Sequence, residues 1–429
     1  MNWFVVAINF VILLGISIYY RTNKELKFSG RLGDLAMSLS GFAVLFSSEY
    51  LVLLYWLGNA EAILALELSM LITIPLALYM SKKQKSAGSL LSHNLLQKDN
   101  MVISSIYLVG YLIIKLTLVL ISSVFILNKL LGWSSVSALV AVIMMVATYT
   151  VFGNFKSLIM SHVFQALIIF VGIFLFITNK SSNLMLQNDI QSLYQISIPV
   201  WKIATVGLLY GIWCWTFEQQ LFQRVNYNSN TNILPVIAII KILAIFVLVG
   251  FSGYTIPQNA LINLGILSVV MASLANIFNG IATLVVEDFY RKIKPVENPW
   301  EGDLISKIII TGLAFFSVLM VLIMKNTTME QVLTLWGFWM NFTIISVVLV
   351  LFSKIKPINI STIVTSYLLG VAINTLPLLF DNQIINKLFI LNIFDKSLLI
   401  IGIVSIVVLV NYLFSMITLN QVKLQKEKM

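Results

Sequence analysis

Long apolar stretches recur along almost the whole sequence, and this recurrence limits the available folds more than any other feature. Thirteen stretches come close to the roughly 20 apolar residues that a helix needs to cross a bilayer. They cover residues 2–20, 34–57, 60–80, 101–129, 134–152, 157–178, 201–222, 232–252, 261–286, 303–325, 330–352, 358–380 and 396–419. With 59% hydrophobic and 10% charged residues, the chain has too little polar surface to cover a globule in water. We therefore expect an all-α polytopic membrane protein.

The loops between these stretches differ in charge. Most of the 27 lysine and arginine residues fall in every second loop, which is the pattern of cytoplasmic loops. This bias predicts an external N-terminus and an internal C-terminus. The first stretch has no basic region before it and no small-residue cleavage site after it, so it is typical of a retained membrane helix. The short loops predict one integral membrane domain over residues 1–429.

Several function classes find no support in the residues. The net charge of +10 is distributed over short loops, so it indicates membrane topology rather than nucleic-acid binding. A single cysteine and two histidines predict no disulfide framework and no metal site. No P-loop and no Ser–His–Asp set is visible, so we expect neither an ATP-driven pump nor an enzyme, and no cofactor.

Two of the predicted spans carry dense polar interruptions. The second contains Gly41, Ser47, Ser48 and Glu49, and the seventh contains Glu218 among neighbouring tryptophans and glutamines. Further ionisable residues inside spans are Glu67, Lys115, His162 and Lys241. Such groups cost several kcal/mol in lipid unless they face protein or water. Interrupted helices at matching places in two halves are typical of transporters with inverted repeats and a site at mid-membrane.

Four segments, in order along the chain, resemble the sodium:solute symporter family of proline, sugar, pantothenate and sialic-acid carriers. They are SGRLGDLAMSLSGFAVLFSSEY (29–50), GNFKSLIMSHVFQALIIFVG (153–172), WCWTFEQQLFQRV (213–225) and MASLANIFNGIATLVVEDFYRK (271–292). The resemblance implies an inverted-repeat fold of five plus five helices. The repeats would cover residues 34–178 and 201–352, after an extra N-terminal helix and basic loop (1–31) and before C-terminal helices and a basic tail (358–429).

The resemblance also implies a cation site. By position, backbone carbonyls would come from Ala43, Phe46 and Val269 and a hydroxyl from Ser273. Ala272 lacks the second hydroxyl of the family pattern, and Leu45 stands where some members have a carboxylate. Ser161 and His162 occupy the place of a Thr-Asp pair, so they are candidates for a proton site or a second cation site.

The same comparison by position implies a solute site between the two interrupted helices. The residues that would line it are Glu49, Tyr50, Glu67, Trp213, Trp215, Glu218 and Gln219. Lys241 is interpreted as structural, Lys115 as snorkelling toward the interface, and Arg224 as a partner for acidic loop residues such as Asp288. Two midspan carboxylates and no clear midspan arginine favour a neutral, zwitterionic or cationic solute over an anionic one.

We therefore expect a secondary transporter that moves a small organic solute together with sodium, or with protons through His162. The alternative is a transporter-like sensor or accessory subunit that has lost sodium coupling, which the missing hydroxyl at Ala272 favours. Partners would be the solute, the coupling cation and the lipid bilayer. Compact loops favour a bacterial inner membrane.

Overall fold

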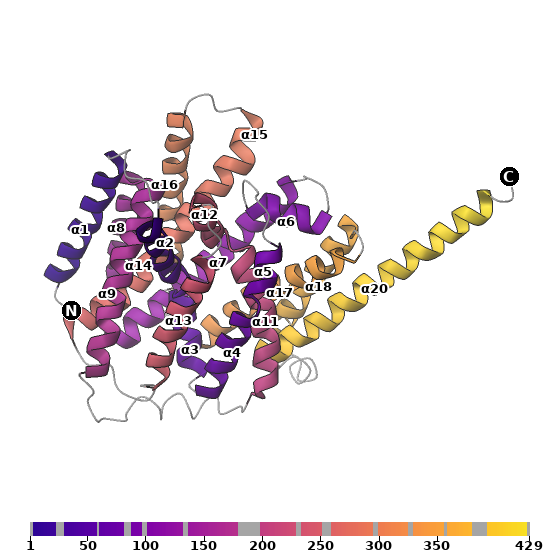
Figure 1. Cartoon of the computed structure of the whole chain (residues 1–429), viewed down its shortest axis with the longest axis horizontal. Helices are drawn as coiled ribbons and strands as arrows, with labels where there is room; N and C mark the ends of the chain where they lie inside the picture. Colours follow the sequence, from indigo (N-terminus) through magenta and orange to yellow (C-terminus); the bar gives the residue numbers. More distant parts are fainter. Residues whose placement is uncertain are drawn as a thin grey trace.

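The protein is described here by a computed structural model (Figure 1). The structure describes residues 3–22, 30–57, 60–80, 87–96, 101–131, 136–178, 198–228, 233–250, 259–294, 299–324, 329–355, 358–379 and 393–426. Within these ranges the ordered elements are all helices. Part of the basic loop predicted after the first span, residues 23–29, lies outside the described residues, as do residues 427–429 of the basic tail.

The described helices occur in the following order along the chain. The first half contains α1 (Trp3–Thr22), α2 (Gly30–Leu45), α3 (Ser48–Leu57), α4 (Ala60–Ile72), α5 (Ile74–Met80), α6 (Ala87–Leu96), α7 (Met101–Leu131), α8 (Val136–Phe152) and α9 (Phe155–Thr178). The second half contains α11 (Val200–Thr216), α12 (Gln219–Asn228), α13 (Ile233–Gly250), α14 (Ala260–Leu284), the π-helix η1 (Val285–Tyr290) and α15 (Arg291–Ile293). It ends with α16 (Pro299–Ile323), α17 (Met329–Ser353), α18 (Ile360–Leu379) and α20 (Ile393–Lys426).

The observed helices agree with the predicted spans in position. Eight described helices are long and apolar enough to cross a membrane, and two bent pairs raise this number to 10. Three shorter apolar helices, Val136–Phe152, Ile233–Val247 and Ile360–Asn374, fall on the three remaining predicted spans. The count of thirteen crossings and the sidedness of the termini stay predictions. The sequence pattern does not predict α6, which lies in the expected loop at residues 81–100.

Polar side chains begin two of the central helices. The side chain of Asn154 accepts a hydrogen bond from the backbone N–H of Ser157 at 2.9 Å, just before α9. The side chain of Asn259 accepts one from Leu261 N–H at 2.9 Å and begins α14. Each side chain satisfies a backbone donor that has no partner in the first helical turn.

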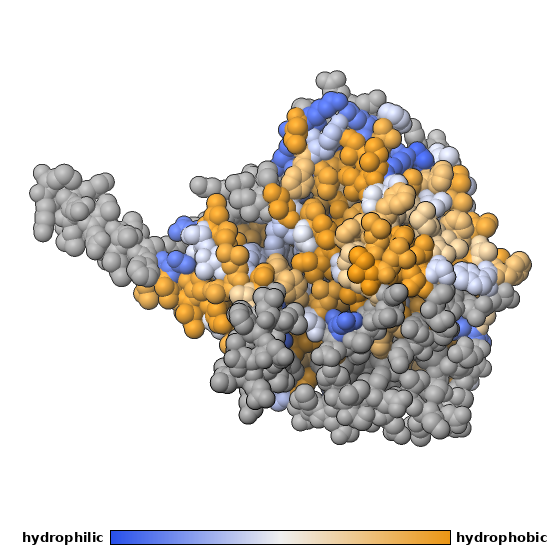
Figure 2. Space-filling model, turned by 180° about the vertical axis from the view of Figure 1, so that it is seen from behind, coloured by the Kyte–Doolittle hydropathy of each residue, from blue (hydrophilic) through white to orange (hydrophobic). Residues whose placement is uncertain are grey.

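The helix α14 forms the centre of the bundle, with 89% of its apolar window buried. It packs on α9, α7, α16 and α8. Gly172 of α9 and Gly265 of α14 allow close approach, since a Cβ added to Gly265 would lie 3.4 Å from Gly172 Cα. By contrast, the windows of α1 and α16 are each only 22% buried, and that of α20 is 28% buried. Apolar side chains accordingly cover much of the described surface on the face shown in Figure 2, as expected for a protein whose perimeter faces lipid.

The two interrupted helices are broken where the sequence predicts. The pair α2 and α3 bends by 62° around Phe46 and Ser47, and the pair α11 and α12 bends by 44° around Phe217 and Glu218. The carbonyls of residues 43–46 accept no backbone hydrogen bond from the described amides of residues 47–50, and the N–H of Ser48 donates to the Ser273 side chain instead. The break thus leaves carbonyl groups at the end of α2 free to bind another ligand.

Candidate functional site

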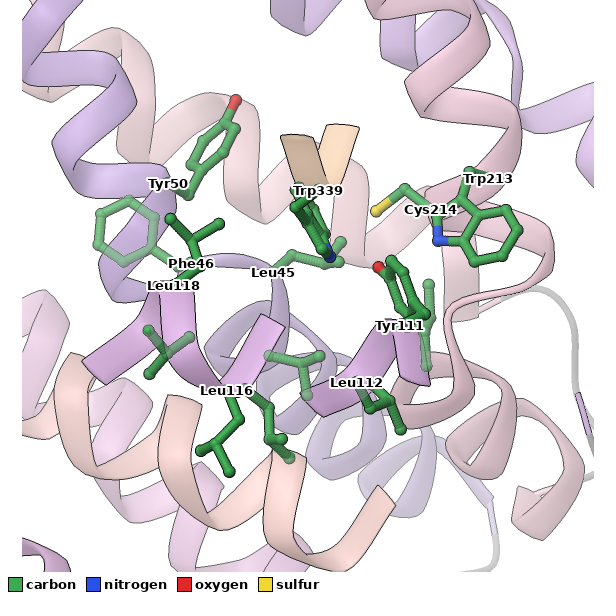
Figure 3. Close-up of a cluster of buried hydrophobic side chains, with 14 of the residues drawn as sticks. Leu45, Phe46, Tyr50, Tyr111, Leu112, Leu116, Leu118, Trp213, Cys214 and Trp339 are labelled. Atoms are coloured by element: carbon green, nitrogen blue, oxygen red, sulfur yellow. The ribbon is translucent and has the colours of Figure 1, made fainter. Parts of the chain in front are cut away.

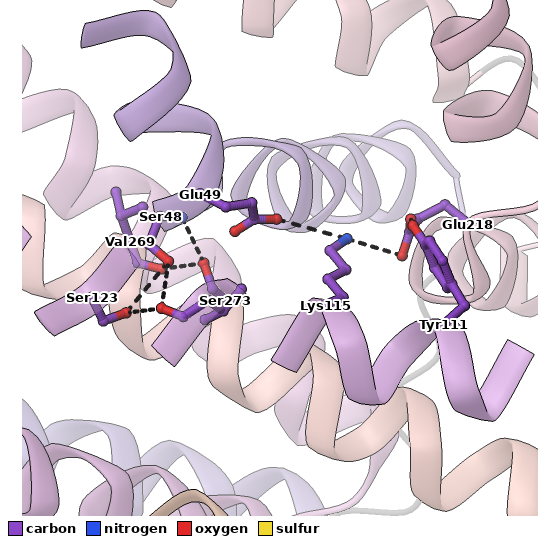
Figure 4. Close-up of polar contacts among 9 residues, drawn as sticks. Ser48, Glu49, Tyr111, Lys115, Ser123, Glu218, Val269 and Ser273 are labelled. Carbon is purple, nitrogen blue, oxygen red and sulfur yellow. Dashed lines mark hydrogen bonds and ion pairs between the residues drawn. The ribbon is translucent and has the colours of Figure 1, made fainter. Parts of the chain in front are cut away.

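A group of serines surrounds the break between α2 and α3, and we call Ser48, Ser123 and Ser273 the serine cluster (Figure 4). The backbone N–H of Ser48 donates to Ser273 Oγ at 3.1 Å, and Ser273 Oγ donates to the carbonyl of Val269 at 2.8 Å. Ser123 Oγ donates to the carbonyl of Val119 at 2.6 Å and to Ser48 Oγ at 3.4 Å. Oxygen atoms from α3, α7 and α14 therefore lie together where α2 ends.

The structure places the four predicted cation ligands in two regions. Val269 and Ser273 belong to α14 and are hydrogen-bonded to each other. Ala43 lies at the buried end of α2 and Phe46 in the break that follows it, where carbonyls are free of backbone hydrogen bonds. The sequence analysis did not assign Ser48 or Ser123 as ligands. Their hydroxyls add oxygen atoms to a set that lacks one at Ala272.

Three buried charged side chains, Glu49, Lys115 and Glu218, form a second group that we call the ion triad. Lys115 Nζ lies 3.1 Å from Glu218 Oε1 and 4.0 Å from Glu49 Oε1 (Figure 4). Tyr111 OH donates to Glu218 Oε2 at 2.7 Å. The expectation that Lys115 snorkels toward the interface is wrong, because its side chain is only 7% exposed and joins the two broken helices from α7.

Aromatic rings pack beside the ion triad (Figure 3). The ring centroid of Tyr111 lies 5.0 Å from that of Trp213 and 5.6 Å from that of Trp339. Lys115 Nζ lies 5.6 Å from the Trp339 ring centroid, within the range of a cation–π contact. Trp213 was predicted to line a solute site. Trp339 and Tyr111 were not, although Tyr111 stands four residues before Lys115 on the same helical face.

Other predicted solute residues have different partners. Trp215 Nε1 donates to the Met70 carbonyl on α4 at 2.8 Å. Gln219 Oε1 accepts from the Ala87 N–H of α6 at 3.1 Å. These bonds connect α11 and α12 to neighbouring helices, so Trp215 and Gln219 have contacts that stabilise packing.

Glu67 and Lys241 form a separate buried ion pair between α4 and α13, with 3.1 Å between Oε1 and Nζ. Lys241 Nζ also lies 4.1 Å from the ring centroid of Tyr50. This geometry agrees with the structural interpretation of Lys241. It gives Glu67 a partner of opposite charge and links the pair to α3 through Tyr50.

A fourth group surrounds Arg224, whose side chain is fully buried. Its guanidinium donates to Ser40 Oγ at 2.8 Å, Gln220 O at 2.6 Å and Asn276 Oδ1 at 2.9 Å, and its Nη2 lies 2.7 Å from His162 Nδ1. The expected pair with an acidic loop residue such as Asp288 is not formed, since Asp288 accepts from Ser105 at 2.6 Å. Among the described residues, no carboxylate lies within ion-pair distance of Arg224.

The contact with Arg224 determines the protonation of His162. Arginine only donates hydrogen bonds, so Nδ1 of His162 must accept and carries no proton. His162 is therefore the neutral tautomer with its proton on Nε2, an atom that is buried without a partner. The hydroxyl of the neighbouring Ser161 is also buried without a partner. This group joins α2, α9, α12 and α14 in the structure.

Several polar atoms around the ion triad are buried and have no hydrogen-bond partner. They are Glu49 Oε2, Tyr50 OH, Trp213 Nε1, Thr216 Oγ1 and Trp339 Nε1. Buried polar atoms are normally paired, so this number in one region points to a ligand-binding role. No group of three or more His, Cys, Asp or Glu side chains that could hold a metal ion occurs in the described part of the chain.

Two broken helices with buried polar groups between them define a class of protein, the membrane transporters that bind ligands at discontinuous helices. Comparison with known proteins supports this class and gives the family. The sequence model of the sodium:solute symporter family matches residues 257–360, which include the motif at 271–292. No curated protein sequence matches the chain.

A solved structure resembles the chain over nearly its full length. It is described as a Na⁺-coupled sialic acid symporter in a substrate-bound outward-open state. The TM-score is 0.70 at 16% identity, with 95% of this chain and 96% of that chain covered. Similarity at this identity establishes the fold alone. Together with the family match over residues 257–360, it supports membership of the sodium:solute symporter family and a role as a membrane transporter rather than an enzyme.

Proposed function

We propose that the protein is a secondary transporter that moves a small organic solute together with sodium by alternating access. The observation that carries the proposal is the contact of Ser48 with Ser273, which in turn bonds Val269, where the end of a broken helix meets the central helix. Free carbonyls and hydroxyls are the oxygen ligands that a hard cation requires. Ala43 and Phe46 would supply carbonyls from the end of α2 and the break after it, and Ser48 and Ser123 would offset the hydroxyl missing at Ala272.

Sodium is preferred over protons as the coupling ion because of the surroundings of His162. Protonation of Nδ1 would place two donors, His162 and Arg224, against each other at 2.7 Å in a buried site. Proton coupling through His162 would therefore first require Arg224 to move away. Ser161 and His162 are accordingly proposed to hold the packing of α9 rather than to bind the coupling ion.

We place the solute between the two broken helices, near Glu49, Tyr50, Trp213 and Glu218. Aromatic rings supply apolar faces, and the unpaired indole N–H groups supply donors. Two carboxylates against one ammonium disfavour an anionic solute, so a neutral, zwitterionic or cationic solute remains the proposal.

The proposed topology follows from the same fold. Two five-helix repeats, 34–178 and 201–352, would each begin with a broken helix, and loop charge would place the N-terminus outside and the C-terminus inside. We propose a bacterial inner membrane as the location. The alternative function is a transporter-like sensor or accessory subunit, which the replacement of a hydroxyl by Ala272 favours.

The test measures the thermal stability of the purified protein at increasing sodium concentration, with choline chloride keeping the total salt constant. A cation that binds only the folded state raises the midpoint by mass action. Ser273→Ala should weaken this effect by about 1–3 kcal/mol, the worth of one lost ligand. Ser317→Ala is a matched control, because Ser317 is also a buried serine bonded to the carbonyl four residues earlier, on the peripheral α16. If sodium causes no specific shift even at high concentration, sodium coupling is dropped, and proton coupling and the sensor alternative become the leading explanations.

A further inference from the structure

The ion triad has an excess of one negative charge when its three groups are ionised, since Glu49 and Glu218 face only Lys115. The two carboxylates do not share the lysine equally, because its Nζ is 3.1 Å from Glu218 but 4.0 Å from Glu49. Tyr111 also donates to Glu218 and not to Glu49. The second oxygen of Glu49, Oε2, is buried without a partner. Glu49 is therefore the less satisfied carboxylate.

Glu49 is also next to the serine cluster. Its neighbour in the chain is Ser48, whose N–H contacts Ser273, and consecutive Cα atoms are about 3.8 Å apart. A cation bound at the serine cluster would thus lie within about 6 to 10 Å of the Glu49 carboxylate, close enough for a strong attraction inside a protein. Lys115 reaches the same carboxylate from α7 (Figure 4).

The other buried charge near this region acts in the opposite direction. Arg224 contacts Asn276, which is three residues after Ser273 on α14 and so one helical turn away. Its guanidinium has no carboxylate partner among the described residues and would repel a cation at the serine cluster. A site placed close to a fixed positive charge needs a nearby negative charge, and Glu49 is the carboxylate next in sequence to the cluster.

We infer that Lys115 is a built-in competitor of the coupling cation for Glu49, and that Glu49 connects the cation site to the solute site. This inference rests on the proposed function, because it assigns residues that set the affinity of the proposed cation site. When the cation is bound, it supplies the positive charge that Glu49 lacks, and Lys115 is left to Glu218 alone. The link that Lys115 makes between α3 and the break before α12 is then released. Cation binding and the relative position of the broken helices are coupled in this way.

The experiment measures equilibrium binding of ²²Na⁺ to the full-length purified protein and two variants. Glu49→Gln removes the carboxylate and should lower sodium affinity by roughly tenfold to a hundredfold, from Coulomb's law at an effective dielectric constant of about 20. Lys115→Met/Glu218→Gln removes the competitor together with its second partner, so that Glu218 is not left as an unpaired buried charge and Glu49 is free for the cation. Because a positive and a negative charge are removed together, this double variant should raise sodium affinity by only about threefold.

A matched control is Glu67→Gln/Lys241→Met, which removes the other buried lysine–glutamate pair and should leave sodium affinity unchanged. The increase in affinity keeps the test valid if Glu49→Gln does not fold, since a damaged protein does not bind sodium more tightly. Unchanged or lower affinity in the Lys115 double variant overturns the inference. Failure of the wild type to bind sodium, or binding unaffected by Ser273→Ala, would instead overturn the proposed cation site.

Discussion

Substitution of Arg224 gives a prediction that differs from the usual expectation that a charge-conserving substitution is the better tolerated one. We expect Arg224→Lys, which keeps the charge, to destabilise the protein more than Arg224→Met, which removes it. The guanidinium has four partners, and the three hydrogens of a lysine ammonium on a flexible stem cannot reproduce their planar arrangement. The lysine charge would stay buried without a carboxylate.

The magnitudes follow from the partners that each variant leaves behind. With methionine at position 224, Ser40 Oγ still lies 3.4 Å from His162 Nδ1 and can donate to it, so Asn276 Oδ1 is the main acceptor left unpaired. One such group costs about 1–3 kcal/mol, and removal of a buried charge offsets part of it. Arg224→Lys loses one or two charge-assisted bonds and keeps the desolvation cost of the charge, which gives about 3–5 kcal/mol.

The chain contains its own probe for this measurement. Cys214 is the single cysteine in the sequence and is buried in the structure. A thiol-reactive fluorogenic maleimide therefore reports unfolding of the wild type and both variants without labelling mutations. The control is Arg21→Lys, because Arg21 is 40% exposed in its ion pair with Asp303 and should tolerate the change. If Arg224→Lys unfolds at the wild-type midpoint, or later than Arg224→Met, the assignment of Arg224 as a buried cation held by neutral acceptors is refuted.

Two further predictions concern the aromatic residues and a close helix contact. Trp213→Phe keeps an aromatic ring against Tyr111 but removes an unpaired N–H donor, so binding of a transported solute should weaken by roughly 1 kcal/mol. The smaller ring leaves a cavity at a fully buried position, so the unfolding midpoint should also fall. Unchanged solute affinity would exclude the indole N–H as a contact. Gly211→Ala would place a Cβ 2.8 Å from Met70 Cα and force α11 away from α4, so stability should fall by about 1–3 kcal/mol in the thiol-reactivity assay, and a wild-type midpoint would contradict this packing.

The breaks in the helices could be predicted because their cause is local. Gly41, Ser47 and Glu49 interrupt one apolar run, and Glu218 interrupts another, so the unusual polarity appears within a few residues of each break. The serine at the start of the central motif, Ser273, was recognisable for the same reason. What a local pattern does not contain is the partner of each polar group.

The pairings that the sequence analysis missed are all long-range. Lys115 meets Glu218 across 103 positions, and Arg224 meets His162 across 62. A charged residue in an apolar span indicates that a partner exists, but hydropathy is the same whether the side chain faces a carboxylate or the membrane interface. The neutral partners of Arg224 were further hidden by the expectation that a buried charge needs an opposite charge. Such pairs are determined by how the helices pack against one another, and no single segment of the sequence specifies that packing.

The burial of α14 has a consequence for how proteins of this kind diverge. A helix with 89% of its apolar window enclosed must fit neighbours on every side, so most substitutions leave a cavity or an overlap. Lipid-facing helices such as α1 exchange one apolar residue for another at little cost. Substitutions are therefore expected to accumulate on the perimeter first. The family match at residues 257–360 contains the whole of α14 together with α16 and α17, in a chain that shares only 16% of its residues with a structure of the same fold. The sequence of the buried helix α14 is therefore expected to change more slowly than the sequences of the lipid-facing helices.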